Sequence, residues 1–302
     1  MLSLDELKSK YSNNKIDYPL LFQNIKRSGS YDDESILDVF VPTYNRDKFA
    51  VKALLYLDRS LRHADIKYNL VCTSFNESPE LEEQCNKLGA ILVCCPLFPK
   101  QHGMFSRALS FDLPCRYLSP TAEWLMFTDC DLLVTEDFIS ETISNLASSN
   151  TWLQPYSGKR VSNLNQESTE IILGSDEFLD LEQQTVTYPK AGAPGGCVVV
   201  PKKLYDKVGG YDSELFWGYG PEDSMFWVKL ESCFSTVDSI AACHVGNATY
   251  AKEATVYHCY HESQQGFTDN FIRMADIHNS FFALPYNQKL ELINHKRELY
   301  ED

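Results

Sequence analysis

Short apolar runs, each bounded by polar or turn-forming residues, recur along the chain from residue 36 onward. Four of these runs predict buried strands, at residues 36–41, 69–73, 90–95 and 124–128. A fifth run, at residues 195–200, predicts a further strand in the second half of the chain.

Amphipathic segments follow these runs. After the first run, apolar residues recur at every third or fourth position and predict one buried helix face: Ala50, Leu54, Leu57 and Leu61. The next helix is expected to begin after Ser78, with Pro79 in its first turn, and to end at Gly89. Helices are also expected over residues 222–234 and past residue 267. This β-α-β-α order predicts an α/β fold with a doubly wound, largely parallel sheet, whose ligands bind at the carboxyl ends of the strands.

The first 35 residues are polar and mixed, and we expect them to form an N-terminal extension that contributes little to the core. No repeat, low-complexity tract or linker rich in Pro, Gly or Ser divides the rest of the chain. The pattern therefore predicts one domain with appendages.

The balance of charge argues against some classes of binding partner. The chain has 27 Lys and Arg against 42 Asp and Glu, a formal net charge of −15. This balance argues against nucleic acid and against anionic membrane surfaces as partners, because both require a basic footprint. If the ligand carries phosphates, a metal ion is expected to hold them.

Neither a signal peptide nor an apolar stretch of the ~20 residues that a membrane helix needs is visible. We therefore expect a cytoplasmic protein without a transmembrane segment, and a luminal domain trimmed of its leader stays an alternative. The ten cysteines include no C-x-x-C pair, and several lie in apolar runs, so buried free thiols are expected rather than disulfides.

Asp129-Cys130-Asp131 is the only Asp-x-Asp in the sequence, and it directly follows the predicted strand at residues 124–128. Both carboxylates are expected at the carboxyl end of that strand. Two carboxylates so close favour a cation between them, and oxygen ligands suit Mg²⁺ or Mn²⁺, which can bridge to a diphosphate. The alternative is a solvated turn in which Asp131 caps a helix.

Two later segments carry further candidate groups. Trp217-Gly-Tyr-Gly-Pro-Glu-Asp223 combines aromatic rings, against which sugar rings pack, with two glycines and two carboxylates at the start of a helix. Stabilisation by the helix dipole alone could also explain these carboxylates. His258 and His261 follow an apolar run and could supply an imidazole ligand, and a satisfied polar group at a strand end is the alternative.

The loop Pro42-Thr-Tyr-Asn-Arg46 ends the first predicted strand. Arg46 can bind a phosphate through two hydrogen bonds, and Tyr44 can stack on a base. Neither G-x-G-x-x-G nor G-x-x-x-x-G-K-[ST] nor G-x-S-x-G occurs, which weakens the dinucleotide-binding, P-loop and hydrolase alternatives.

Taken in order, these motifs resemble those of GT-A-fold, nucleotide-sugar-dependent glycosyltransferases, nearest the β-1,4-galactosyltransferases and the related bacterial-type family 2 enzymes. The segments that carry the resemblance are Pro42-Thr-Tyr-Asn-Arg46, Phe105-Ser-Arg-Ala108, Asp129-Cys-Asp131, Gly195-Gly196, Trp217-Gly-Tyr-Gly-Pro-Glu-Asp-Ser224 and His258. The resemblance spans about residues 36–262, the expected GT-A domain. It leaves residues 1–35 as an N-terminal extension and residues 263–302 as a C-terminal helical segment.

The resemblance implies a role for each of these residues. The nucleotide sugar would be bound by Pro42, Thr43, Tyr44, Arg46, Phe105, Arg107, Asp129, Gly195 and Gly196. Asp131 and His258 would bind Mn²⁺ or Mg²⁺, with Asp129 close by and His261 as a reserve ligand. Asp223 would be the general base, and the acceptor would be held by Trp217, Tyr219 and Glu222.

Three positions depart from the family pattern. Ser224 replaces an Asp and Tyr219 replaces a Trp, so the identity of the acceptor does not carry over. Ala193 stands where the family has an aromatic residue near the donor sugar, which puts galactose itself in doubt.

The implied function is the transfer of a sugar, from a UDP-sugar of the galactose or N-acetylgalactosamine kind, to a saccharide or glycoconjugate acceptor in glycan biosynthesis. Inversion at the anomeric carbon is expected. The alternatives are a retaining transferase, a catalytically inactive carbohydrate-binding protein on the same fold, and a sugar nucleotidyltransferase.

Overall fold

The structure is a computed structural model of the chain and describes residues 1–97, 105–146, 152–156, 161–184, 186–187, 196–218, 220–234, 249–250, 255–261 and 269–301. Its centre is a sheet whose inner strands run parallel: β2 (Leu37–Thr43), β3 (Tyr68–Ser74), β4 (Ile91–Cys94) and β5 (Trp124–Thr128). The four N-terminal apolar runs predict these four strands to within two residues at either end. The expected α/β fold with a largely parallel sheet is confirmed.

Further strands extend this sheet on both sides. β1 (Lys26–Ser28) pairs antiparallel with β4, and β10 (Cys197–Pro201) pairs antiparallel with β5. Beyond β10 lie β7 (Leu153–Gln154) and β11 (Thr249–Tyr250). Among the described strands, the order is β1-β4-β3-β2-β5-β10-β7-β11. The apolar run at residues 195–200 predicts β10 but not its direction, because burial alone does not encode strand polarity.

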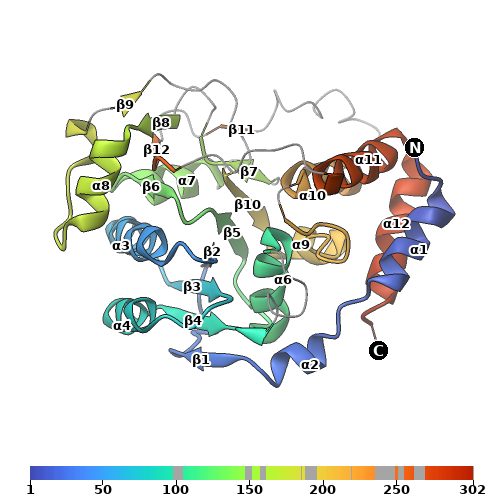
Figure 1. Cartoon of the computed structure of the whole chain (residues 1–302), viewed down its shortest axis with the longest axis horizontal. Coiled ribbons are helices and arrows are strands. Elements are labelled where there is room, and N and C mark those ends of the chain that lie inside the picture. Colours follow the sequence, from blue (N-terminus) through green and yellow to red (C-terminus); the bar gives the residue numbers. More distant parts are fainter. Residues whose placement is uncertain are drawn as a thin grey trace.

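A second, smaller sheet follows the carboxyl end of β5 (Figure 1). Its order is β6-β12-β8-β9, with β6 at Leu132–Val134, β12 at Val256–His258, β8 at Val161–Leu164 and β9 at Val186–Thr187. The apolar pattern predicts none of these as a paired sheet. Strands of two to four residues are too short to show a period.

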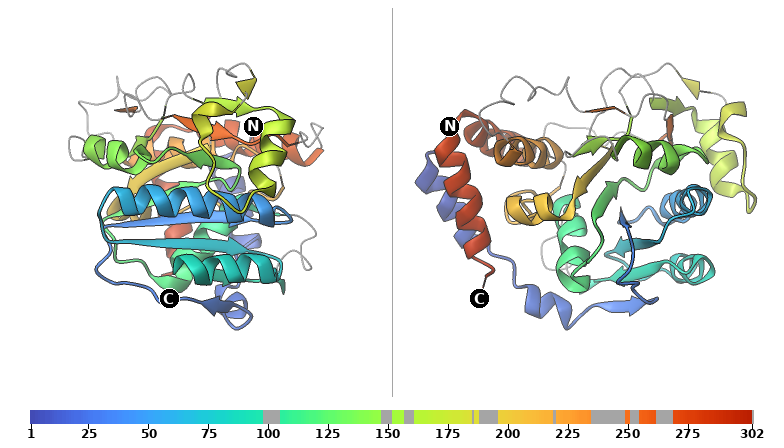
Figure 2. Two further views of the ribbon diagram at one scale, coloured as in Figure 1. Left: turned by 90° about the vertical axis from the view of Figure 1, so that its left-hand side faces the viewer. Right: turned by 180° about the vertical axis from the view of Figure 1, so that it is seen from behind.

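Helices cover both faces of the large sheet (Figures 1 and 2). One face is covered by α3 (Asp47–His63) and α4 (Pro79–Leu88), and the other by α6 (Arg107–Leu118), α9 (Lys202–Val208) and α10 (Glu222–Phe234). Since neither face meets water, the inner strands carry apolar residues at consecutive positions, which explains why their runs are unbroken.

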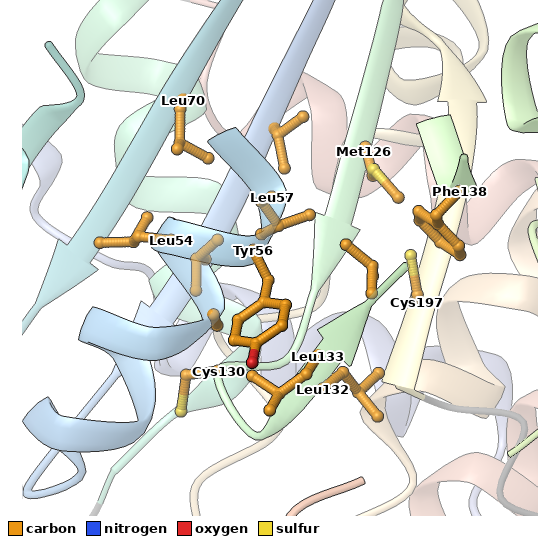
Figure 3. Packing of buried hydrophobic residues seen from close by; sticks show 14 of the residues in the cluster. Leu54, Tyr56, Leu57, Leu70, Met126, Cys130, Leu132, Leu133, Phe138 and Cys197 are labelled. Carbon is orange, nitrogen blue, oxygen red and sulfur yellow. The ribbon is translucent and has the colours of Figure 1, made fainter. Parts of the chain in front are cut away.

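Alternate residues of β2 enter two separate cores. Leu37, Val39 and Val41 pack with the apolar face of α3, whereas Phe40 stacks on Phe127 on the opposite side of the sheet. Figure 3 shows part of the first core, including Leu54, Leu57, Leu70, Met126 and Phe138. Cysteines contribute to both cores, and the nine that the structure describes are buried and free, as expected from the sequence.

The remaining helices flank the small sheet and the chain ends. α7 (Phe138–Leu146), α8 (Gln166–Gly174) and a short 3-10 helix, η2 (Leu181–Gln183), add residues to the first core beside the small sheet. No helix in the described part of the chain is both long and apolar enough to cross a membrane.

The first and last segments of the chain pack together on the α10 side of the molecule. α1 (Leu4–Asn13) and α2 (Tyr18–Phe22) belong to the first segment, and α11 (Asp269–Ala283) and α12 (Tyr286–Glu298) to the last. α1 contacts both α11 and α12, and it lies alongside α12 in Figure 1.

The expectation that the first 35 residues contribute little to the core is wrong. Five of their apolar side chains are buried: Leu7, Tyr11, Ile16, Tyr18 and Leu21. Leu7 and Tyr11 lie one turn apart on α1, so they form an inward stripe while the polar residues between them cover the outer face.

Two buried lysines and three buried carboxylates join the terminal helices to the rest of the fold. Lys296 of α12 lies 3.3 Å from Asp212, 3.5 Å from Glu214 and 3.8 Å from Asp112. Lys229 of α10 lies 2.7 Å from the same Asp212 oxygen. All five side chains are at most 1% exposed, so each charge depends on the others for its stabilisation.

Asp112 of α6 is also held by neutral donors in this cluster. Its Oδ1 accepts hydrogen bonds from the Tyr205 hydroxyl at 2.6 Å and from the Tyr211 backbone N–H at 2.8 Å. Gly210 makes this approach possible, because its φ is +68° and a Cβ there would lie 2.4 Å from Asp112 Oδ1.

We predict that Lys296→Met destabilises the protein by about 3–5 kcal/mol, the range for removing one partner of a buried ion pair. Asp212 would then keep Lys229, whereas Glu214 and Asp112 would lose their ion pairs with Lys296. The free energy of unfolding in urea is the measurement. Arg297→Met is the matched control, because Arg297 forms an exposed pair with Glu301 and should cost at most about 1 kcal/mol. Equal losses for both variants would contradict the structural role of the cluster.

Candidate active site

The candidate groups meet at the carboxyl ends of β2 and β5, where the small sheet begins. Asp131 directly precedes β6, and β6 pairs antiparallel with β12, so that Leu132 and His258 are register partners. The backbone N–H of Cys259 donates to the carbonyl of Asp131 at 2.9 Å. This strand pair brings His258 beside Asp131 although more than one hundred residues separate them.

Asp131, His258 and His261 form a group that could hold a metal ion, with their ligand atoms all within 4.8 Å of one another. The Nε2 atom of His261 lies 3.2 Å from Asp131 Oδ2, and that of His258 lies 3.9 Å from the same oxygen. The two imidazole rings meet edge to face, with centroids 5.2 Å apart. The sequence singled out all three residues.

Arg46 contacts the same group from the end of β2. Its Nη1 donates to Asp131 Oδ2 at 2.6 Å, and its Nη2 lies 3.4 Å from His261 Nδ1. Burial by itself would raise the pKa of Asp131, but the hydrogen bond from His261 and the charges of His258 and Arg46 lower it to about 2. The carboxylate is therefore ionised throughout the physiological range.

Asp129 points to a different partner. Its Oδ1 accepts from Arg107 Nε at 2.5 Å, and Arg107 also contacts Glu222 Oε1 at 3.4 Å. Asp129 is not part of the Asp131–His258–His261 group among the described residues, so its role as a further metal ligand stays a prediction. The structure adds a bridge that the sequence did not predict, in which Arg107 joins the Asp-x-Asp segment to the start of α10.

Burial changes the acidity of the two carboxyl groups on Arg107. Desolvation raises the pKa of Asp129 above its usual range, although the charge of Arg107 opposes this change. Desolvation also raises the pKa of Glu222 to about 8, again against Arg107. Glu222 is 8% exposed, and its Oε2 has no hydrogen-bond partner among the described residues.

Asp223 differs from its neighbour Glu222 in exposure and contacts. Its side chain is half-buried, and its Oδ1 accepts from the backbone N–H of Ser224 at 2.6 Å, within the first turn of α10. Two adjacent acids at one helix start are thus in unlike environments, one buried and one accessible.

An aromatic platform lies beside the Pro42–Arg46 loop. The rings of Tyr44 and Phe105 are stacked with centroids 5.8 Å apart and planes 9° apart, and Phe75 meets Phe105 at its edge. Thr43 is 1% exposed, and its hydroxyl has no hydrogen-bond partner among the described residues. The region has flat apolar faces and an unpaired hydroxyl, which suit a nucleoside.

The segment around Phe105 is bonded to the Trp217 segment. Gly218 N–H donates to the Phe105 carbonyl at 2.6 Å, and the Ser106 hydroxyl donates to the Phe216 carbonyl at 2.8 Å. Trp217 is half-buried in the same small apolar cluster as Tyr44 and Phe105. Two motifs that are far apart in sequence therefore form one wall of the site.

Gly196 and Tyr156 lie beneath the Asp-x-Asp turn. The Gly196 carbonyl accepts from the Asp129 N–H at 2.8 Å, and a Cβ at Gly196 would lie 2.5 Å from Leu132 Cδ1 and 2.8 Å from the Tyr156 hydroxyl. Tyr156 is buried and its hydroxyl is unpaired among the described residues. The sequence did not single out Tyr156, because no local pattern marks a residue whose neighbours come from other strands.

Two of the expected site residues, Gly195 and Tyr219, lie outside the described residues, as does Ala193. Ten of the remaining fourteen fall in three groups, and Pro42, Thr43, Gly196 and Asp223 belong to none of these groups. Arg46 joins Asp131, His258 and His261; Arg107 joins Asp129 and Glu222; and the aromatic wall holds Tyr44, Phe105 and Trp217.

Comparison with known proteins gives two findings, one family match to part of the chain and several solved structures with a similar fold. The family described as the N-terminal domain of galactosyltransferase matches residues 178–261, a segment that contains Glu222, Asp223, His258 and His261. No curated protein sequence matches the chain.

Solved structures that are similar to this chain include a mannosyltransferase, a galactosyltransferase and TarS. The mannosyltransferase PcManGT from Pyrobaculum calidifontis, in complex with GDP-Man and Mn²⁺, has a TM-score of 0.50 at 14% identity, covering 99% of this chain and 82% of that one. The catalytic domain of Drosophila β1,4-galactosyltransferase 7, in complex with xylobiose, gives 0.47 at 14% identity over 78% and 76% of the two chains. S. aureus TarS 1–349 in complex with UDP gives 0.49 at 14% identity over 85% and 69%.

At such low identity the likeness to solved structures concerns the fold alone, and the family match adds the segment that contains the helix start and the histidines. Both agree with the motifs that the sequence displays in order. The chain has the GT-A fold, and its resemblance to nucleotide-sugar-dependent glycosyltransferases is confirmed.

Proposed function

We propose that the protein is a metal-dependent glycosyltransferase that moves a sugar from a nucleoside-diphosphate sugar to a saccharide or glycoconjugate acceptor. The observation that carries this proposal is the meeting of Asp131, His258 and His261, with Arg46 and Arg107, an aromatic wall and the Glu222–Asp223 pair as the other parts of the site. Each part supports one requirement of the reaction.

The metal group fits a divalent cation. Ligand atoms that lie about 2.1 Å from one ion are at most about 4.2 Å apart, and the two Asp131–histidine separations of 3.2 and 3.9 Å meet this limit. Two imidazoles and one carboxylate favour a first-row transition ion such as Mn²⁺ over Mg²⁺, which prefers oxygen ligands alone. When bound, the ion would neutralise the negative charge that develops on the leaving diphosphate.

The chain's own residues account for binding of the donor. The stacked Tyr44 and Phe105 rings offer a face for the base, and the unpaired Thr43 hydroxyl offers a donor or acceptor. Arg46 carries a charge that can meet the diphosphate at the end of β2. We propose a UDP-sugar of the galactose or N-acetylgalactosamine kind as the donor.

Asp223 is the group that we assign as general base in an inverting displacement. It is half-buried, and its carboxylate can take the proton from an acceptor hydroxyl as the oxygen attacks the anomeric carbon. Glu222, whose pKa is about 8, is neutral near pH 7 and suits a hydrogen bond to the acceptor better than proton abstraction.

The experiment that tests the proposal incubates the protein with Mn²⁺, a panel of nucleotide sugars and simple saccharides, and measures the released nucleotide product. Release of nucleoside diphosphate that depends on the saccharide supports the transferase. Release of pyrophosphate would indicate a nucleotidyltransferase. Binding of the donor with no release in any combination would indicate an inactive carbohydrate-binding protein, and the anomeric configuration of a product separates inversion from retention.

We predict that chelation by EDTA abolishes transfer and that Mn²⁺ restores it better than Mg²⁺. Asp131→Asn should weaken Mn²⁺ binding by at least about 100-fold, the upper end of the loss seen when only an outer-sphere partner is removed. Calorimetric titration with Mn²⁺ measures this. Asp137→Asn, which changes an exposed carboxylate paired with His63, is the control and should bind as the unmodified protein does. Unchanged affinity in Asp131→Asn would leave Asp131 with a structural role alone.

We predict that Asp223→Asn slows the chemical step by roughly 10²–10⁴-fold while donor and Mn²⁺ affinity persist, because an amide cannot take a proton. Glu222→Gln should chiefly raise the apparent KM for the acceptor. Turnover and melting temperature measured together on both variants separate catalysis from stability. Normal turnover in Asp223→Asn would remove this residue from the mechanism.

Glu222 also makes stability depend on pH. Its pKa is about 8 in the folded protein, against about 4.3 for an exposed Glu. Between these values the folded state binds more protons than the unfolded state, so its contribution to stability is full at low pH and is lost as pH rises. We predict that the free energy of unfolding falls between pH 5 and pH 8 relative to Glu222→Gln, by at most about 1.4 kcal/mol per pH unit. Parallel pH profiles for the two proteins would contradict the raised pKa.

A further inference from the structure

One carboxylate oxygen in the site is shared by three nitrogen groups. Asp131 Oδ2 lies 2.6 Å from Arg46 Nη1, 3.2 Å from His261 Nε2 and 3.9 Å from His258 Nε2. Arg46 also reaches the far side of the His261 ring, with Nη2 at 3.4 Å from Nδ1. A single guanidinium therefore contacts two of the three residues that form the candidate metal group.

These contacts determine the tautomer of His261. A guanidinium can only donate hydrogen bonds, so His261 Nδ1 must accept from Arg46 and carries no proton. The proton of the neutral ring is then on Nε2, where it is donated to Asp131 Oδ2. A metal ion at this place needs the Nε2 lone pair, which requires the proton on Nδ1 instead. With the proton there, Nδ1 and Arg46 would present two donors to each other.

We propose that Arg46 and a divalent cation compete for Asp131, so that binding of the ion releases the Arg46 side chain and makes its charge available to the diphosphate of the donor. This inference rests on the proposed metal centre and nucleotide-sugar donor. Arg46 is thereby a positioning residue that couples the two ligands, in addition to any contact with the phosphates.

The surroundings of Arg46 permit such a movement. Its side chain is 30% exposed, whereas that of Asp131 is 9% exposed. Its backbone is fixed, since the Arg46 carbonyl accepts from the Ala50 N–H in the first turn of α3, so the side chain can swing while the loop stays in place. The guanidinium lies 6.0 Å from the Phe49 ring centroid, a contact that is weak enough to be replaced.

Arg107 provides an internal contrast. It also contacts an aspartate of the Asp-x-Asp segment, but it lies between Asp129 and Glu222 and its side chain is 14% exposed. No imidazole contacts it in the described part of the chain, so a metal ion bound to His258 and His261 would not require it to leave. Competition is therefore specific to Arg46.

Competition implies a measurable coupling between the two ligands. The ion alone must displace Arg46 from Asp131, whereas the ion together with a diphosphate gives Arg46 a new anionic partner. Each ligand should therefore strengthen the binding of the other by the same factor. If the charge of Arg46 is removed, the ion binds Asp131 without displacing an arginine. The factor by which the ion and the diphosphate strengthen each other's binding then becomes smaller.

The test measures Mn²⁺ affinity by electron paramagnetic resonance of the free ion, with and without UDP, in the full-length protein. Arg46→Gln should bind Mn²⁺ alone about tenfold more tightly than the unmodified protein, the factor that corresponds to losing one charge-assisted hydrogen bond. The increase in Mn²⁺ affinity caused by UDP should be smaller in Arg46→Gln. Arg59→Gln is the matched control, because Arg59 pairs with Glu136 away from the site, and it should behave as the unmodified protein does.

A second measurement separates competition from a general effect of charge. The ¹⁵N shifts of histidine show which ring nitrogen carries the proton. In the unmodified protein, His261 should have its proton on Nε2 and should change to Nδ1 when Zn²⁺, a diamagnetic probe, is added. In Arg46→Gln, the preference for Nε2 should be reduced before Zn²⁺ is added. An unchanged proportion of the two tautomers in Arg46→Gln would overturn the inference.

Other results would also overturn it, and they differ from failure of the proposed function. If Arg46→Gln binds Mn²⁺ equally or more weakly than the unmodified protein, Arg46 supports the ion instead of competing with it, and the metal centre itself stands. If Mn²⁺ binds to neither protein, the metal centre is wrong and the inference falls with it. Melting temperatures of the variants show whether a change in affinity reflects loss of fold.

Discussion

A carboxylate that is removed from water requires a cation beside it, and this constraint governs both parts of α6. Its first residue, Arg107, contacts both Asp129 and Glu222 at the candidate active site. Further along the same helix, Asp112 belongs to the buried cluster that contains Lys296. One helix thus connects the candidate active site with the terminal helices of the chain. Leu7 and Tyr11 of α1 pack in the same core as Phe111 of α6, so the first 35 residues contribute to that core.

The sequence predicts the strands well where both faces of the sheet are buried, because such strands consist of consecutive apolar residues. The strands β2 to β5 and the limits of α4, from the Ser78 cap to the left-handed Gly89, follow from such local rules. For α1 the local signals were present, because Ser3 and Glu6 form a capping box and Leu7 and Tyr11 recur at helix spacing, but the polar composition of the segment hid them. The direction of β10 and the small sheet depend on contacts between distant segments, which no local pattern reports.

The candidate site shows the same limit at the scale of side chains. The order of the motifs predicted Asp131, His258 and His261 as candidate metal ligands. The pairing of β6 with β12 explains why they lie close together. The bridge from Asp129 through Arg107 to Glu222 and the buried Tyr156 could not be predicted, because they depend on distances between residues from separate parts of the chain. Residue type and order thus indicate which groups take part, and the fold decides which of them share a partner.

The two aspartates of the Asp-x-Asp segment have unlike surroundings because the chain turns between them. The Leu132 N–H donates to the Asp129 carbonyl at 3.4 Å, and the turn sends one carboxylate toward Arg107 and the other toward Arg46 and the histidines. Asp129 and Glu222 both contact Arg107, so these two carboxyl groups share one fixed partner. Asp131 faces groups that can be exchanged, since an imidazole can transfer its proton between ring nitrogens and Arg46 can move. An acidic chain can bind an anionic donor at such a place, because the cations that approach Asp131 are the ones that a diphosphate also attracts.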